Sequence, residues 1–193
     1  MLKYIRKVVR VNMEEIRVNR NDGNDNCIVA FVFSCPGQRE ETSGLLVRGT
    51  TGNNLDLLLN SLHNEFSQIF HSANRYDYRI TNASDIVHYK AHDNRTEATK
   101  TEIKQPENCQ RLYKDLKGFR YIIAFGDKAI YAVSLLASRL GKSIIINCKY
   151  HLGMQSINRR ITKDIHGKTI VAGQKDNTAK RIEEVKRNIV EQL

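Results

Sequence analysis

The sequence lacks several patterns that would assign it to a familiar class. There is no run of about 18 apolar residues, so a transmembrane helix and a membrane partner are not expected. The N-terminus has neither the apolar core nor the small-residue cleavage site of a signal peptide, and a cytoplasmic protein is the default. No two of the four cysteines have C-x-x-C spacing, which argues against a zinc or iron–sulfur site. We therefore expect no metal and no cofactor.

A strong positive charge balance is present instead. Lysine and arginine total 31 against 21 acidic residues, a formal net charge of +10. Each phosphate that a basic side chain neutralises releases condensed counterions, so a polyanion such as DNA is the natural partner. A merely basic soluble protein is the alternative at this point. The length of 193 residues fits one domain spanning 1–193, and nothing in the sequence demands more than a monomer.

Short apolar runs alternate with helical patterns along the chain. Runs rich in Val, Ile and aromatic residues suit strands buried on both faces, and they cover residues 27–33, 78–81, 121–125 and 143–147. Helical periodicity is expected from a cap at Asn53 or Asn54 to residue 70, over 107–116, over 128–140, and from 178 to the end. This alternation predicts an α/β fold, a three-layer α/β/α sandwich around a short, mostly parallel four-stranded sheet.

Two further segments have weaker patterns. Residues 89–105 are polar and without a period, which predicts a long loop near the functional edge of the sheet. The first 20 residues fit either an amphipathic helix or an added strand, and the sequence does not choose between them.

Ligands of open parallel sheets bind at the carboxyl ends of the strands. This rule selects the segments SCPGQREE, NASD, GDKA and CKYHLGMQSINRR, which follow the predicted strands in that order. A glycine-rich stretch, GLLVRGTTG, also precedes a helix, where free N–H groups and Arg48 favour an anion.

The order of these motifs resembles the uracil-DNA glycosylase superfamily. The turn FSCPGQREE, the glycine-rich loop before NNLDLLL, the strand end RITN, the helix start ENC, the turn YIIAFGDKA and the final YHLG are each similar to a family motif. The nearest likeness is to the bacterial branch that has a Gly-Glu-x-Pro-Gly turn. The resemblance covers about residues 27–160 and rests on order and spacing, because no single piece is specific.

The resemblance implies base excision from double-stranded DNA. The target nucleotide would be flipped into a pocket and its glycosidic bond hydrolysed, without a lysine placed for strand cleavage. Asn82 would read the base edge, and His151 would stabilise the departing base anion. The base pocket would comprise Phe33, Ser34, Cys35, Pro36 and Gly37. DNA would contact Arg48, Gly153, the candidate wedges Met154 and Gln155, and the phosphate-binding Arg159 and Arg160.

The chain also departs from the family pattern. Ser34 stands where that branch has an acid that positions water, so Glu40 is the best-aligned substitute, with Glu41 and Asp85 also in reach. That branch binds an iron–sulfur cluster through four cysteines, and in this chain only Cys109 stands at one of the four positions. The unusual pocket residues favour a modified or damaged base, such as a hypermodified pyrimidine of phage DNA. The setting would then be anti-phage defence or DNA repair.

Two other functions remain open from the sequence. The missing acid is compatible with a catalytically inactive DNA-binding protein on the same fold. An unrelated α/β enzyme could instead handle a nucleotide through the Gly44–Gly52 loop, although that loop matches neither G-x-x-x-x-G-K-[ST] nor G-x-G-x-x-G.

Overall fold

A computed structural model describes residues 20–193. The first 20 residues, for which the sequence allows a helix or an added strand, lie outside the described part of the chain except for Arg20. The described residues form one sheet in the order β2-β1-β3-β4. Its strands are β1 (Val29–Phe33), β2 (Arg79–Asn82), β3 (Tyr121–Phe125) and β4 (Ile144–Cys148). All neighbouring strands pair in parallel, so the four-stranded sheet is confirmed and is fully parallel.

The central strands explain why the sheet must be covered on both faces. Every residue of β1 and β3 is buried, which matches their continuous apolar sequences VAFVF and YIIAF. Alternate side chains enter two separate cores. Phe31 and Phe33 contribute to one core, whereas Ala30 and Val32 contribute to the other.

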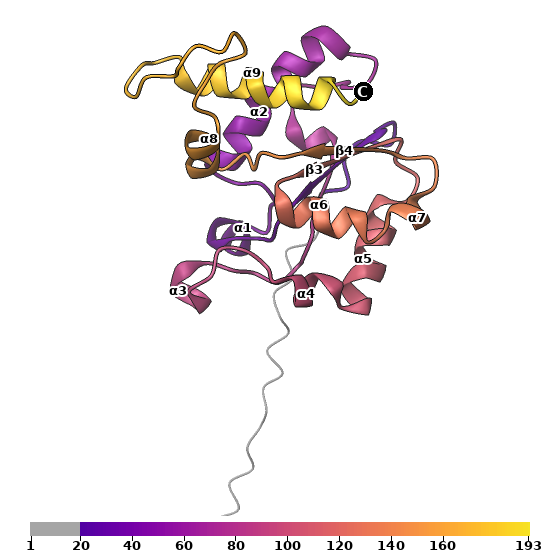
Figure 1. Ribbon diagram of the computed structural model, residues 1–193. Coiled ribbons are helices and arrows are strands. Elements are labelled where there is room, and N and C mark those ends of the chain that lie inside the picture. The colour runs from indigo at the N-terminus through magenta and orange to yellow at the C-terminus, as the bar shows by residue number, and fades with distance from the viewer. Residues whose placement is uncertain (1–19) are drawn as a thin grey trace, which may run out of the picture.

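Helices complete these two cores and confirm the three-layer sandwich (Figure 1). On one face lie α2 (Thr50–Phe66) and α9 (Asn177–Val190), which pack against each other. On the other lie α5 (Pro106–Leu116), α6 (Asp127–Ser134) and α7 (Ala137–Leu140). No helix of residues 20–193 is long and apolar enough to span a bilayer.

Two of the predicted helices differ from the structure, and the first of them, α2, ends at Phe66 rather than at residue 70. Helix α2 begins at Thr50 after Gly49, whose φ of 72° and ψ of −146° give a non-helical cap, so neither Asn53 nor Asn54 caps it. Asn54 instead lies inside the helix and is buried. The predicted helix at 128–140 is two helices, because the chain turns between α6 and α7 where Leu136 enters the core.

The prediction of a long loop at residues 89–105 is wrong in part. This segment contains α3 (Lys90–Asp93) and α4 (Lys100–Lys104). Helix α4 begins with a capping box, in which Thr99 Oγ1 accepts from the Glu102 amide and Glu102 accepts from the Thr99 amide. That Thr-x-x-Glu spacing is visible in the sequence and was the missed signal. Further short helices are η1 (Arg75–Asp77), α1 (Gln38–Ser43) and α8 (Met154–Arg160).

The topology creates a crevice between β1 and β3. The chain leaves β1 towards α2 on one face, and it leaves β3 towards α6 on the opposite face. Where neighbouring parallel strands connect to opposite faces, the loops separate and leave room for a ligand at the carboxyl ends. Phe33 and Phe125 are the last residues of these two strands.

Candidate functional site

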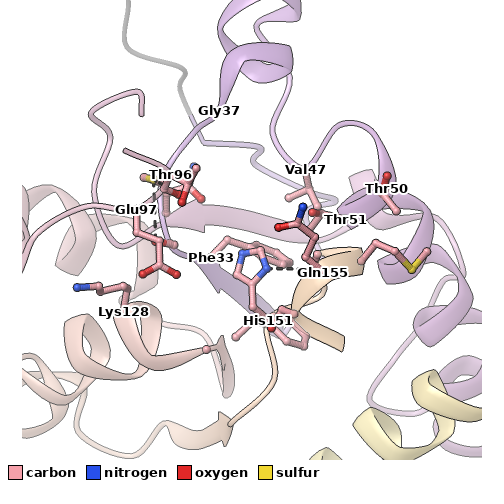
Figure 2. A pocket seen from close by; sticks show the side chains of 18 of the residues that line it. Phe33, Gly37, Val47, Thr50, Thr51, Thr96, Glu97, Lys128, His151 and Gln155 are labelled. Carbon is pink, nitrogen blue, oxygen red and sulfur yellow. Dashed lines mark hydrogen bonds between the residues drawn. The ribbon is translucent and has the colours of Figure 1, made fainter. Parts of the chain in front are cut away.

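A pocket of about 680 Å³ opens at this crevice. Its walls come from the ends of β1 and β2, the loop before α2, the residues between α3 and α4, the start of α6, and the segment from His151 through α8. Figure 2 shows His151 and Phe33 between two walls, with Glu97 and Lys128 on one and Val47, Thr51 and Gln155 on the other. The carboxyl edge that the sequence selected is therefore where this cavity lies.

The structure brings most of the predicted site residues into this one pocket. The lining includes Asn82 and His151, which come from separate crossovers. Pro36 and Arg48 are not among the lining residues. Pro36 is buried, and its carbonyl accepts from the His88 amide at 3.0 Å, while Arg48 is exposed. The predicted residues that line the pocket are Phe33, Ser34, Cys35, Gly37, Glu40, Asn82, His151, Gly153, Met154, Gln155, Arg159 and Arg160.

The hydrogen bonding of His151 determines which ring nitrogen carries the proton. The Gly153 amide donates to His151 Nδ1 at 3.0 Å, so Nδ1 is an acceptor and the neutral ring holds its proton on Nε2. No hydrogen bond joins Nε2 to residues 20–193. Burial lowers the pKa of His151 below 6.5, and the nearby positive charge of Arg160 lowers it further. The result is a neutral imidazole whose Nε2–H remains available to a ligand.

Close packing positions the backbone at His151. A Cβ on Gly126 would lie 3.2 Å from His151 Cβ, closer than most such contacts, and the φ of 81° at Gly126 also favours glycine in the β3–α6 turn. Leu152 is fully buried, and the Asn54 side chain donates to its carbonyl at 2.7 Å. Asn54 thus links α2 to the residue next to His151, and this hydrogen bond gives a buried polar side chain inside the helix a partner.

Asn82 places an unused amide at the carboxyl end of β2. The residue is 5% exposed, and its backbone carbonyl accepts from Arg111 Nη2 at 2.7 Å. No hydrogen bond joins its side-chain amide to residues 20–193. A nearly buried amide without partners costs stability unless a ligand or water satisfies it, so this group is suited to recognising a polar edge.

Phe33 supplies an aromatic surface beside the imidazole. Its ring stacks on Phe125 with centroids 5.0 Å apart, and it meets the His151 ring edge-on at 6.3 Å. Because Phe125 supports it and β1 is buried, the ring has a defined orientation at the pocket floor. Such a ring can stack on a planar base.

The next two residues line the pocket but provide no ready nucleophile or base. Ser34 is 5% exposed, and its hydroxyl lies 3.9 Å from Cys35 Sγ. Burial raises the pKa of Cys35 to about 11, so its thiol stays protonated at neutral pH. The Cys35 thiol donates to the Thr96 carbonyl at 3.8 Å.

Glu40 is committed to the loop that forms one wall. Its Oε2 accepts from the Gly37 amide at 2.6 Å and its Oε1 from the Val47 amide at 3.0 Å. Burial raises its pKa even though these amides favour the charged form. Val47 has a φ of 55°, which is unusual for a β-branched residue, and its buried side chain lines the pocket. Glu40 thus holds a strained turn in place.

The predicted DNA-contacting side chains of α8 differ in whether they already have partners within the protein. Met154 packs against the core, whereas Gln155 is exposed, so Gln155 is the better placed of the two candidate wedges. Arg160 donates to the Lys149 carbonyl and to Asp127, both at 3.0 Å. Arg159 is exposed and has no hydrogen bond or ion pair with residues 20–193.

The pocket also contains residues to which the sequence reasoning assigned no role. Asp127 and Lys128 follow β3 in the GDKA segment, which was expected at this edge. Thr96 and Glu97 come from the segment interpreted as a loop, and nothing in its polar sequence distinguishes them from their neighbours. The remaining unassigned lining residues are Arg39, Val47, Thr50, Thr51, His88, Phe125, Gly126 and Ser156.

The described residues 20–193 contain no group of three or more His, Cys, Asp or Glu side chains that could hold a metal ion. The groups in the pocket that bear on recognition and catalysis include an imidazole N–H, an amide, carboxylates and a stacking ring. No protein-family model matches this chain, and a search of curated proteins finds no match either.

Proposed function

We propose that this protein is a monofunctional DNA glycosylase that flips out a modified or damaged base and hydrolyses its glycosidic bond. The observation that carries the proposal is the meeting of Asn82 and His151 in one pocket at the carboxyl edge of the sheet. The amide has free donors and an acceptor for a base edge, and the imidazole offers an Nε2–H. The likeness of the motif order to uracil-DNA glycosylases adds to this argument.

The chemistry follows from the charge that develops as the bond breaks. The C1′–N electron pair leaves with the base, so the base becomes anionic and the sugar cationic. The His151 Nε2–H donates a hydrogen bond to the anionic base and stabilises it in the transition state. A neutral imidazole can do this without transferring a full proton. Phe33 stacks on the base, and Asn82 selects it by hydrogen bonding.

The size of the pocket bears on the substrate. A cavity of about 680 Å³ lies in the range that holds drug-sized ligands, which is larger than an unmodified pyrimidine requires. The wall that carries Glu97 and Lys128 is polar. We therefore favour a base with a bulky polar substituent, such as a hypermodified pyrimidine, and a role in anti-phage defence or repair.

DNA would approach across α8 and the loop before α2. The free guanidinium of Arg159 at the pocket rim is available to a phosphate, and Gln155 is available to fill the gap left by the flipped base. The same proposal takes the protein to be a cytoplasmic monomer, in line with its length and composition.

The decisive experiment measures base release. Purified protein is incubated with duplexes that carry uracil, damaged pyrimidines or glycosylated cytosines, and free bases are identified by mass spectrometry. We expect release from at least one duplex, with alkali-sensitive abasic sites in the DNA. Asn82→Ala should reduce the rate at least tenfold, because the amide no longer positions the base.

A second candidate is a DNA-binding protein without activity. It is favoured by one observation, that Ser34 and Glu40 offer no uncommitted carboxylate at the β1 turn. It predicts salt-dependent DNA binding with no base released from any of these duplexes.

A further inference from the structure

Three carboxylates line the pocket, and they differ in their bonding. Both oxygens of Glu40 accept backbone amides, and Asp127 pairs with Arg160 at 3.0 Å. Glu97 is exposed and makes no hydrogen bond or ion pair with residues 20–193. Among these three, Glu97 is thus the carboxylate that can bind water or substrate without breaking an existing contact.

Glu97 reaches the pocket from a segment that packs against the β1 turn. The Cys35 thiol donates to the carbonyl of the preceding residue, Thr96, at 3.8 Å. The carboxylate lies close enough to raise the pKa of Cys35 by its charge, in addition to the larger effect of burial. Figure 2 places Glu97 on the wall opposite Gln155, with the His151 ring between them. Glu97 and His151 therefore face the same cavity from different sides.

The segment that carries Glu97 is anchored on both sides. Before it, the His88 amide donates to the Pro36 carbonyl at 3.0 Å, and His88 Nδ1 contacts Asp93 at 2.5 Å. Arg95 then bridges Asp93 at 2.9 Å and Glu102 at 3.0 Å. This network spans the chain before and after Glu97. The backbone that carries Glu97 therefore has a defined position at the pocket wall.

We propose that Glu97 is a catalytic residue that positions and deprotonates the attacking water, in place of the acid missing from the β1 turn. The inference rests on the proposed glycosylase function. The C1′–N bond breaks and its electron pair leaves with the base. Water oxygen bonds to C1′, and one water proton passes to the Glu97 carboxylate. That proton then returns to solvent while the released base takes up another, so water is the only reactant consumed.

The test compares Glu97→Gln with a matched control, Glu107→Gln. Glu107 is an exposed glutamate in the first turn of α5 that does not line this pocket. We expect Glu97→Gln to lower the single-turnover rate of base release about 100-fold with unchanged DNA affinity, because general-base groups contribute at least that much. Glu107→Gln should retain the wild-type rate. Added formate should restore part of the rate of Glu97→Ala and leave wild type unaffected, which a merely structural role would not produce.

The outcomes separate the two proposals. If wild type releases bases and Glu97→Gln releases them equally fast, Glu97 is not the base and the glycosylase function stands. If Glu97→Ala is slow but formate does not help it, the catalytic role is overturned in favour of a positioning role. If wild type releases no base from any duplex, both proposals fail together.

Discussion

Asn82 lines two polar cavities. One is the pocket at the carboxyl edge of the sheet, and the other is a smaller cavity of about 330 Å³ beside β2. The smaller cavity borders a set of interlocked side chains, here named the rear cluster, that consists of Thr81, Asn108, Arg111 and Asp115. Asp115 accepts from Thr81 at 2.9 Å and from Arg111 at 2.9 Å. Asn108 donates to the Ala83 carbonyl at 2.7 Å.

The two regions differ in how their polar groups are satisfied. In the rear cluster each side chain has partners inside the protein, and it joins α5 to the end of β2. In the pocket, the Asn82 amide, the His151 Nε2 and the Glu97 carboxylate have no hydrogen bond with residues 20–193. A saturated buried network stabilises and orders a fold, whereas unused polar groups in a cavity are available to a ligand. Mutations should therefore affect stability in one region and activity in the other.

The largest effect is expected in the rear cluster. Asp115→Ala removes the acceptor of Arg111 and Thr81 and should lower the free energy of unfolding by about 3 kcal/mol, as expected when a buried ion pair loses one partner. Urea unfolding measures this loss. Asp127→Ala, which breaks an exposed pair at the pocket rim, is the control and should cost less than about 1 kcal/mol. If both variants lost the same free energy of unfolding, the proposed difference between the rear cluster and the pocket rim would be wrong.

Removing the His151 imidazole should reduce activity while leaving stability nearly unchanged. His151→Ala is expected to slow base release at least about 100-fold, equivalent to about 2.7 kcal/mol of transition-state stabilisation. Its DNA affinity and its circular dichroism spectrum should stay close to wild type, because His151 lines the pocket and lies outside every helix and strand of the described residues. Single-turnover kinetics on the best duplex provide the measurement. A fully active His151→Ala protein would remove this residue from the mechanism.

The lowered pKa of His151 links the pocket to stability in acid. Since the folded pKa lies below the unfolded value of about 6.5, the unfolded chain binds the proton first as pH falls. The free energy of unfolding should therefore decrease as pH drops below about 6.5, with at most about 1.4 kcal/mol per pH unit from this group. His151→Gln should show a shallower decrease between pH 7 and 5. Identical pH curves for the two proteins would contradict the lowered pKa.

The smallest effect concerns the surface of the pocket rim. Arg159→Ala should weaken binding to any duplex and reduce the slope of log K against log salt by about 0.9, because one fewer phosphate is neutralised. Lys142→Ala removes an exposed charge at the amino end of β4, on the opposite edge of the sheet, and should leave the slope unchanged. Titrations at several salt concentrations distinguish the two variants. The same slope for both would place the DNA elsewhere.

Much of the fold was readable from local patterns. The apolar runs at 27–33, 78–81, 121–125 and 143–147 each overlap a strand, with ends that differ by at most two residues, because continuous apolar sequences fit a sheet covered on both faces. The short helices α1, α3, α4 and α8 were not predicted. Glu40 accepts from the Gly37 amide at the start of α1, and a capping box begins α4. All four helices are too short for a period to appear in the sequence.

The sequence alone determined the alternation of strands and helices, the positive charge, and which segments follow the strands. The rule for parallel sheets then places those segments at one edge, so that Asn82 and His151 could be named beforehand. Only the tertiary structure decided which polar groups are occupied. Glu40 is bound to backbone amides and Glu97 is free, although both are glutamates in polar segments. Glu40 accepts from amides only three and seven residues away, yet these bonds form because the loop after β1 folds back on itself, and that conformation depends on three-dimensional packing.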